Sequence, residues 1–449
     1  MQDSHPNFIY IVCHDLGKHL GSYGVNVLTP NLDRFAKNGA LFTQSYCSSP
    51  ACSPSRGCAM TGQYAHTNGL MGLVNNGWSL PEETMTIVDH LNSAGYETVH
   101  FGLQHERAYA EQNRYQIEGN HYSPDDYINR PKDWVENVVD DAITYLEKRR
   151  SQDTPFYLNI GTIEVHSSRW QGGLEDGHPQ NRSINYGIDP SERVDVPNYV
   201  PDIPQIRQGL GRFQGAIRYL DVHLQRLFDA VERLGYSENT LIIFTTDHGI
   251  ANMRAKTWLY DRGVEIALML QMPGTIPAGI VIDDLIPNID LVPTILEAAG
   301  VTIPDSIQGR SFWKKLIGET YSPHDYIITE RNWHDSFDPM RAVRTKQYHY
   351  IRNFDRTAKK AWLPHDVPTM NESYSYWYTE LWPPLELERP QEELYDTFAD
   401  PEEINNLADN DAYHSRKSEL STILDQWMQD TDDPILKGAI PDKLNGWYT

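Results

Sequence analysis

Short runs of apolar residues recur along the chain and alternate with longer stretches that have helical spacing. The first run covers residues 8–12 and ends in the polar pair His14-Asp15. Further strands are predicted at residues 97–101, 156–160, 241–245 and 266–270. Continuous apolar runs of this length are typical of strands that are buried on both faces of a sheet. The pattern therefore predicts a central sheet whose first strand ends in polar residues.

Helical spacing fills the intervals between these strands. The predicted helices cover residues 31–37, 83–94, 134–149 and 204–234. Thr29-Pro30 precedes the first helix and Gly39 follows it, and these residues are typical of a helix start and a helix end. Strands that alternate with helices need crossover connections. The predicted fold class is therefore α/β, with a large, mostly parallel sheet sandwiched by helices.

The pattern changes in the last quarter of the chain. Two segments with alternating side chains, 340–344 and 348–352, flank a turn at Lys346-Gln347. This alternation is typical of an antiparallel hairpin. An amphipathic helix follows at residues 415–428.

Two domains follow from this change. We expect a large α/β domain over residues 1–338 and a smaller C-terminal α+β domain, which contains the antiparallel sheet, over residues 339–449. A long Gly-, Asn- and Pro-rich stretch at 167–200 interrupts the large domain. Loops of this length are usually functional or disordered, and we expect this one to line a substrate site.

Charge excludes two classes of partner. The chain has 38 basic and 62 acidic residues, and its net charge of −24 repels nucleic acids and anionic membranes. No apolar run approaches the roughly 18 residues that a membrane span requires. An anionic substrate would therefore have to meet cations gathered at one site.

Cysteine usage and the first residues give two further expectations. All four cysteines lie in the first sixth of the chain and form no disulfide framework. Residues 1–6 show neither a basic nor an apolar segment, so we expect a cytoplasmic protein, or a periplasmic or secreted one if a leader has been removed. The sequence leaves the oligomeric state open.

The most informative segment is Cys52-Ser53-Pro54-Ser55-Arg56, which Thr61-Gly62 follows after a short apolar stretch. A proline here cannot extend a strand but can open a helix, so Cys52 and Arg56 would face one site at the helix start. An anionic group fits such a position. The alternative is an ordinary buried cysteine in a Ser/Pro turn.

These residues resemble the signature of the type I sulfatases of the alkaline phosphatase superfamily, in which the cysteine is oxidised to formylglycine. The resemblance implies an alkaline-phosphatase-like fold, a divalent metal, and a formylglycine-generating (sulfatase-maturing) enzyme as a partner. It also implies a mechanism, because one oxygen of the hydrated aldehyde attacks sulfur and the other later expels sulfate. Cys52 and Arg56 would then be catalytic residues.

Two predicted strand ends supply candidate metal ligands, His14-Asp15 and Asp247-His248. Sulfatases usually carry Asp-Asp at the first position and Asp-Asn or Asp-His at the second. The resemblance therefore implies a metal site formed by His14, Asp15, Cys52, Asp247 and His248. Calcium is the expected ion, and the imidazoles leave manganese, magnesium or zinc as alternatives. A simpler interpretation is that each pair caps nearby backbone amides.

The segment after the strand at 97–101 resembles a catalytic segment of the family with one departure. His105 matches the histidine that acts on the formylglycine hydroxyl, but Leu103 stands where the family has a lysine. The candidate substitutes for that lysine are Lys18, His19 and Arg107. An isolated histidine after a strand is otherwise more often structural or solvated.

Two later segments also match family positions. His166 corresponds to the histidine near the leaving-group oxygen, and an ordinary pKa near neutrality would let it donate a proton at working pH. Glu164 would contact the substrate or orient that ring. Lys256 precedes Tyr260-Asp261 at the family spacing and would bind a sulfate oxygen. Alone, a surface lysine would carry no such meaning.

Other phrases resemble the heparan N-sulfatases and their bacterial relatives, including His66-Thr67-Asn68-Gly69 and Glu393-Leu394-Tyr395-Asp396. The resemblance implies hydrolysis of a sulfate ester or N-sulfo group on a sulfated saccharide, such as a glycosaminoglycan, or on another small sulfated substrate. His334 would then touch the sugar. Two alternatives stay open: a phosphonate or phosphate monoester hydrolase of the same superfamily, and a catalytically silent sugar-binding homologue.

Overall fold

The computed structural model of the chain describes residues 5–108, 114–119, 135–166, 187–200, 202–251, 254–334, 336–356 and 389–443. Its centre is an eight-stranded sheet in the order β5-β4-β6-β1-β7-β8-β2-β9. The strands are β1 (Asn7–Cys13), β2 (Ala40–Phe42), β4 (Glu97–Gly102), β5 (Ile117–Glu118), β6 (Phe156–Gly161), β7 (Thr240–Thr246), β8 (Leu268–Gln271) and β9 (Ile280–Ile282). Only β8 among these strands runs antiparallel to its neighbours. The predicted mostly parallel sheet is confirmed.

β1 lies in the middle of this sheet, and all seven of its residues are buried. It pairs in parallel with β6 on one side and with β7 on the other. Successive side chains enter different hydrophobic cores, for example Ile9 on one face and Tyr10 on the other. Because both faces of the strand are covered, the sequence shows an unbroken apolar run here.

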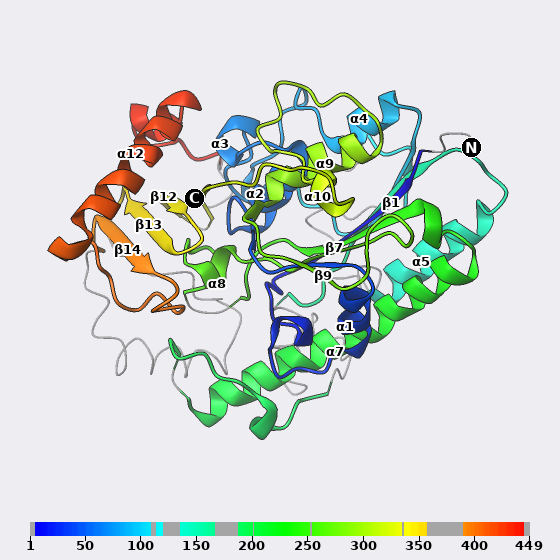
Figure 1. Cartoon of the computed structure of the whole chain (residues 1–449), viewed down its shortest axis with the longest axis horizontal. Helices are drawn as coiled ribbons and strands as arrows, with labels where there is room; N and C mark the ends of the chain where they lie inside the picture. Colours follow the sequence, from blue (N-terminus) through cyan, green and yellow to red (C-terminus); the bar gives the residue numbers. More distant parts are fainter. Residues whose placement is uncertain are drawn as a thin grey trace.

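Helices cover both faces of the sheet (Figure 1). One face packs against α1 (Pro30–Lys37), α5 (Val135–Lys148) and α7 (Pro204–Arg233). The other face packs against α2 (Cys52–Thr61), α4 (Ile87–Ser93), α9 (Leu291–Ala298) and α10 (Trp313–Leu316). The predicted sandwich of helices around the sheet is therefore confirmed.

Shorter elements complete the large unit. β3 (Ser45–Tyr46) pairs with β10 (Ile286–Pro287). Two short α-helices are α3 (Ala65–Asn68) and α8 (Asp261–Val264). The 3-10 helices of the described residues are Gly21–Tyr23, Val74–Asn76, Ser191–Arg193, Ser237–Asn239, Asn288–Asp290, Asp411–Tyr413 and Pro434–Lys437.

A second, antiparallel sheet has the order β11-β12-β13-β14. Its strands are β11 (Ile327–Trp333), β12 (Phe337–Arg344), β13 (Tyr348–Asn353) and β14 (Glu392–Asp396). One face of it packs against α12 (His414–Asp430), and the other face meets Tyr46 and Tyr260 of the large unit. The hairpin expected around Lys346-Gln347 is confirmed. The sheet begins at Ile327, which precedes the boundary expected at residue 338.

A buried network of charges joins the two units, and Figure 1 shows α8 beside the antiparallel sheet. Arg344 of β12 donates hydrogen bonds to both carboxylate oxygens of Asp261, at 2.9 Å and 2.8 Å. Nδ1 of His349 lies 2.5 Å from Oε1 of Glu403, and the other oxygen of Glu403 accepts from the amide of Asp261 at 2.6 Å. α8 is therefore fixed to the sheet by polar contacts as well as by apolar packing.

Two expected segments differ from the structure or fall outside it. α4 begins at Ile87 rather than residue 83, because Thr86 caps the helix and its amide donates to Asp89 over 2.8 Å. Residues 167–186 of the expected substrate loop lie outside the described residues. Within the described parts of the chain, no helix has both the length and the apolar character that crossing a bilayer requires.

Candidate active site

The carboxyl ends of β1 and β7 bring two pairs of polar residues together. Cys13 pairs with Thr246 in the parallel register, so His14-Asp15 and Asp247-His248 leave the sheet side by side. The amide of Asp15 donates a hydrogen bond to Oδ1 of Asp247 over 3.0 Å, although 232 positions separate the two residues. All four side chains are buried. The register of the sheet therefore fixes the two carboxylates next to each other.

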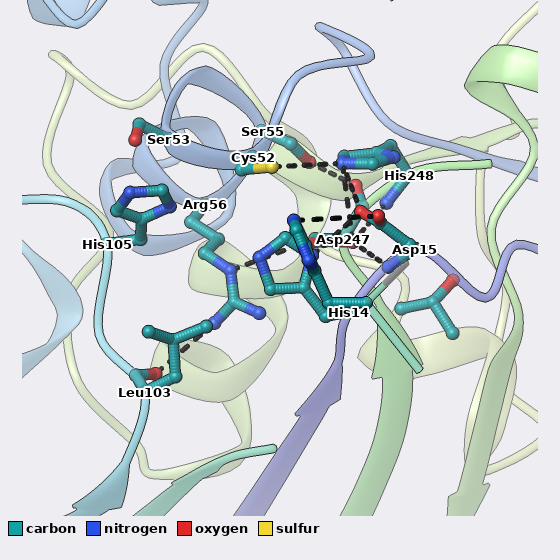
Figure 2. A network of polar contacts seen from close by, with 12 residues as sticks. His14, Asp15, Cys52, Ser53, Ser55, Arg56, Leu103, His105, Asp247 and His248 are labelled. Carbon is teal, nitrogen blue, oxygen red and sulfur yellow. Dashed lines mark hydrogen bonds and ion pairs between the residues drawn. The ribbon is translucent and has the colours of Figure 1, made fainter. Parts of the chain in front are cut away.

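Cys52 is the first residue of α2, and Figure 2 shows its sulfur pointing toward these strand ends. Its Sγ lies 3.4 Å from Nε2 of His248. Arg56 follows one helical turn later, and its Nε donates to Oδ2 of Asp247 over 3.3 Å while Nη1 donates to the carbonyl of Leu103 over 3.3 Å. The predicted helix start at the Cys-Arg motif is confirmed, because helical spacing brings both side chains to one side.

Asn288 holds three segments of the site together. Its Oδ1 accepts a hydrogen bond from the amide of Ser48 over 3.0 Å, and its Nδ2 donates to the carbonyl and hydroxyl oxygens of Ser55 at 3.0 Å and 3.1 Å. The hydroxyl of Ser55 in turn donates to the carbonyl of Asp247. Sequence reasoning missed Asn288, because its partners lie 233 and 240 positions away and no short motif spans that distance.

Imidazole rings gather around the first strand end. Nδ1 of His14 lies 2.8 Å from Oδ1 of Asp15 and 3.2 Å from Oδ2 of Asp247. The ring of His166 meets that of His14 edge-on, with centroids 4.7 Å apart. The ring of His105 lies 6.4 Å from the ring of His14. The fold thus brings together the histidines that the sequence identified on three separate strand ends.

Lys256 places a positive charge directly on the site. Its Nζ donates to both carboxylate oxygens of Asp15, at 2.9 Å and 3.0 Å, and its side chain is almost fully buried. Nε2 of His248 also lies 3.2 Å from Oδ1 of Asp15. A single carboxylate therefore sits between an ammonium group and an imidazole.

Buried charges shift the pKa values of this site in opposite directions. Burial alone would raise the pKa of the Cys52 thiol, but the charges of Lys256 and His14 lower it well below its usual value. Burial opposes protonation of His14, but Asp247 and Cys52 raise its pKa to about 9. Burial would raise the pKa of Asp15, but Lys256 lowers it well below its usual range. The site therefore stabilises negative groups on oxygen and sulfur.

His166 does not have the near-neutral pKa that the sequence led us to expect. Burial lowers its pKa to about 3, the carboxylate of Asp15 opposes this shift, and the positive charges of Lys256 and His14 add to it. The imidazole is therefore neutral at neutral pH, and it carries a single N–H proton rather than a positive charge.

The same residues fit a divalent metal. One donor atom each from His14, Asp15, Cys52, Asp247 and His248 lies within 4.8 Å of all the others, and all five residues are buried. Nε2 of His14 has no hydrogen-bond partner within the described residues. Two carboxylates, two imidazoles and a sulfur form a mixed donor set, which suits a cation that accepts nitrogen as well as oxygen.

Three residues were candidate substitutes for the lysine that is missing at Leu103. The observed contacts of all three are with residues outside this site. Nζ of Lys18 donates to the carbonyl of Thr43 and to Glu265, at 2.6 Å and 2.7 Å. The ring of His19 packs edge-on against Phe213.

Arg107 is likewise held elsewhere. Its guanidinium donates to the backbone carbonyls of Pro81 and Thr84, at 2.9 Å and 2.8 Å. It supports the polypeptide between α3 and α4 instead of the catalytic centre. Leu103 itself contributes its carbonyl oxygen, which accepts from Arg56.

The two expected substrate contacts occupy buried positions. The carboxylate of Glu164 accepts a hydrogen bond of 2.9 Å from the amide of Val135 at the start of α5. This side chain is fully buried and favourably placed at a helix N-terminus, and its expected contact with substrate stays a prediction. Its backbone orients the site, since the amide of His14 donates to the Glu164 carbonyl over 3.1 Å. His334 directly follows β11 and has 6 % of its surface exposed, and its role stays a prediction.

Two family models match the chain. The model described as Sulfatase matches residues 6–301. The model described as N-sulphoglucosamine sulphohydrolase, C-terminal, matches residues 247–375. The two matches overlap at the segment that contains Asp247, His248 and Lys256.

Characterised relatives are similar along nearly the whole chain. An ulvan-active sulfatase of Formosa agariphila is 26 % identical over 94 % of this chain and 74 % of its own length. An N-acetylglucosamine-6-O-sulfatase of Bacteroides thetaiotaomicron is 23 % identical over 95 % of this chain and 87 % of its own length.

Solved structures share the fold. A structure from work on glycosaminoglycan metabolism by Bacteroides thetaiotaomicron has a TM-score of 0.77 at 21 % identity, over 96 % of this chain and 98 % of that one. A phosphonate monoester hydrolase from Silicibacter pomeroyi has a TM-score of 0.68 at 19 % identity, over 96 % of each chain. Since the same architecture carries both chemistries, the residues of the site must distinguish them.

Proposed function

Because the chain belongs to the sulfatase family and is a sulfuric ester hydrolase, we propose that it removes a sulfate group from a sulfated saccharide. The observation that carries the proposal is the position of Cys52. This residue begins α2, and its sulfur lies within 4.8 Å of the ligand atoms of four candidate metal-binding side chains. A relative named as an N-acetylglucosamine-6-O-sulfatase supports a saccharide as the substrate class. The match to the N-sulphoglucosamine sulphohydrolase C-terminal model keeps N-sulfo groups among the candidates.

Sulfatases use a divalent metal and a formylglycine, and this chain offers residues for both. In the proposal, a sulfatase-maturing enzyme converts Cys52 to formylglycine, whose hydrated side chain provides the attacking hydroxyl. His14, Asp15, Asp247 and His248 hold the metal together with that side chain. When bound, the metal supplies positive charge that lowers the pKa of a hydroxyl group beside it. Calcium is the first candidate, and the two imidazoles leave manganese, magnesium or zinc as alternatives.

Two basic side chains of the site stabilise the charge of a sulfate group. Lys256 and Arg56 are both buried, so their positive charges act in a region of low dielectric constant and with little screening. Nη2 of Arg56 has no hydrogen-bond partner within the described residues, and it retains a donor for an anionic oxygen. These local cations offset the overall charge of −24, which would otherwise repel the substrate.

Two histidines interact with the reacting atoms in this proposal. His105 accepts the proton of the attacking hydroxyl, and the N–H group of His166 donates a hydrogen bond to the departing atom of the sugar. Their rings lie 6.4 Å and 4.7 Å from the ring of His14. Since burial keeps His166 neutral, it stabilises the departing atom by a hydrogen bond that strengthens as negative charge develops there.

The first experiment compares the purified protein with its Cys52→Ala and Cys58→Ala variants. Sulfate release from N-sulfated and from 6-O-sulfated glucosamine is measured after chelation and re-addition of Ca²⁺, Mn²⁺, Mg²⁺ or Zn²⁺. We expect Cys52→Ala to lower kcat by at least about 10³-fold, because the nucleophile is lost. Cys58 lies on the same helix and is equally buried, so Cys58→Ala serves as the matched control and retains activity. Mass spectrometry of the peptide containing Cys52 should show the aldehyde.

Three outcomes would contradict the proposal. Wild-type rates in the Cys52→Ala variant would exclude this residue as the nucleophile. Faster turnover of 4-nitrophenyl phosphate or a phosphonate monoester than of any sulfate would favour the phosphoryl alternative. Saccharide binding without hydrolysis, after restoration of each metal and with the aldehyde present, would indicate a silent homologue.

A further inference from the structure

Two arginine side chains converge on one tryptophan beside the candidate active site. Cζ of Arg389 lies 5.0 Å from the ring centroid of Trp258, and Cζ of Arg331 lies 5.9 Å from it. Asp338 bridges the two guanidinium groups, because one carboxylate oxygen lies 3.0 Å from Nη1 of Arg331 and the other accepts from Nη2 of Arg389 over 2.5 Å. We call Arg331, Arg389 and Trp258 the arginine–tryptophan cluster.

The cluster lies against the segment that leads into the nucleophile helix. Thr257, between Lys256 and Trp258, donates its amide proton to the carbonyl of Pro50 over 2.8 Å. On the other side, the amide of Glu330, which precedes Arg331, donates to the carbonyl of Ser48 over 2.9 Å. Residues 48–50 are therefore held from both sides by the backbones that carry the cluster, two residues before Cys52.

Arg389 has hydrogen-bond donors that lack a strong acceptor, unlike two arginines of the same sheet with structural roles. Two other arginines of the same strand system each face a carboxylate with several donors: Arg341 binds Asp433 through Nε and Nη2, and Arg344 binds Asp261 in the same way. Nε of Arg389 has no hydrogen-bond partner within the described residues, and its Nη1 meets the sulfur of Met340 at 3.3 Å. A thioether is a weak acceptor, so Arg389 keeps donors for a stronger one.

The chemistry of the cluster suits one class of ligand. A guanidinium group presents a planar fork that matches the oxygens of a carboxylate or a sulfate. Trp258 is half-buried, and its ring offers a flat apolar surface beside that fork. A sugar that carries an anionic group presents both kinds of surface, since its C–H face is apolar.

We propose that the arginine–tryptophan cluster binds a second anionic group of the substrate, a carboxylate or a further sulfate, next to the sulfate that is removed. The inference rests on the proposed function and extends it to specificity. Asp338 acts as a positioning residue, because it holds the two guanidinium groups together. The enzyme accordingly prefers saccharides with at least two anionic groups over those with one.

The experiment measures this preference directly in the metal-loaded enzyme. Three substrates are compared: glucosamine with one sulfate, glucosamine with two sulfates, and a sulfated disaccharide that carries a uronic acid. We expect Arg389→Gln to lower the ratio of kcat/KM for a doubly anionic over the singly sulfated substrate by about tenfold or more, mainly through KM, because one charge-assisted hydrogen bond is lost. The substrate whose ratio falls more identifies the second group as sulfate or carboxylate.

Two variants control for charge and for folding. Arg389→Lys keeps the positive charge but loses the fork, and its ratio should fall between the wild type and Arg389→Gln. Arg352 lies on β13 and pairs with Asp425 of α12, so Arg352→Gln should leave the ratio unchanged. Where Arg389→Gln does not fold, Arg331→Gln and Trp258→Leu test the same cluster.

Binding to an inactive protein separates this inference from the proposed function. In the Cys52→Ala background, calorimetric titration is carried out with doubly sulfated glucosamine and with the sulfated disaccharide that carries a uronic acid. At least one of these ligands should bind more weakly when Arg389→Gln is added. Equal losses for singly and doubly anionic substrates, or unchanged affinity for both ligands in the titration, would overturn the inference. If the wild type hydrolyses no sulfated sugar, the proposed function fails, but the titration still decides whether the cluster binds the anion.

Discussion

At the scale of single residues, the candidate site depends on polar groups that hold its backbone segments together. Asn288 connects the loop before the nucleophile helix, the helix itself and, through Ser55, the end of β7. It is buried, so water cannot take the place of its hydrogen-bond partners. A polar group that loses its partner in such a place costs the protein stability.

We expect Asn288→Ala to lower the free energy of unfolding by about 2–4 kcal/mol, because buried groups of Ser48 and Ser55 lose their partners. We also expect kcat to fall, because the start of α2 is no longer tied to the segment at Ser48. Urea unfolding and sulfate release measure the two effects. The partly exposed Asn239 provides the control Asn239→Ala, and a normal kcat in Asn288→Ala would show that the connection does not position the nucleophile.

The residues that sequence reasoning could find are those with local signals. Cys52 and Arg56 are four positions apart, and a helix brings such positions together whatever the rest of the fold does. His166 was placed well, but its expected near-neutral pKa was wrong, because burial depends on partners distant in sequence. Glu164 illustrates the same limit, since its partner Val135 lies 29 positions away.

At the scale of elements, α8 and the antiparallel sheet are joined by charges. Asp261, His349 and Glu403 have the spacing of metal ligands. The guanidinium of Arg344, however, already occupies both oxygens of Asp261. This group is therefore a buried polar network, in which the Arg344 guanidinium takes the place that a metal would need.

Removal of one partner from this network should be costly. We expect Arg344→Gln to lower the free energy of unfolding by about 3–5 kcal/mol, because it leaves the Asp261 carboxylate buried without its cation. The double variant with Asp261→Asn should lose less than the sum of the two single variants. Chemical denaturation measures all three, and Lys346→Gln, at an exposed ion pair, is the control. Strictly additive losses would contradict the direct coupling of the two charges.

The helices and strands were largely predictable where the burial of apolar side chains determines the sequence pattern. β1 and the β12–β13 hairpin show the expected patterns, since the side chains of each pack into cores on both faces of their sheet. β11 was missed because its centre, Glu330-Arg331-Asn332, is polar and yet buried in hydrogen bonds. The direction of β8 could not be predicted either, because an apolar run carries no information on strand polarity.

At the scale of the whole molecule, buried ion pairs determine how stability responds to pH. The charges of His66 and Arg341 overcome the effect of burial and lower the pKa of Glu330 to about 2. Arg344 does the same for Asp261, whose pKa is also about 2. Such a carboxyl group stabilises the fold above its unfolded pKa, and this contribution is lost as the pH falls through its folded pKa.

We therefore expect the free energy of unfolding to decrease steadily between about pH 4.5 and pH 2, as these carboxylates are protonated. Urea unfolding at a series of pH values measures this dependence. Glu330→Gln removes one of the titrating groups, so its stability should fall less steeply in the same interval. An identical slope in this variant would contradict the assignment to Glu330. The partly exposed and uncharged Asn239 provides the control Asn239→Ala, whose slope should match the wild type.

The central position of β1 has a consequence for the order of events at the ribosome. The segment that contains Cys52 is synthesised well before β7, Asp247 and Asn288. In the folded protein these later segments enclose the start of α2. Until they arrive, the thiol stays open to solvent, whereas in the finished molecule it is 4 % exposed. We expect any modifying enzyme to act during this interval, and a chain that folds in its absence to retain the cysteine permanently.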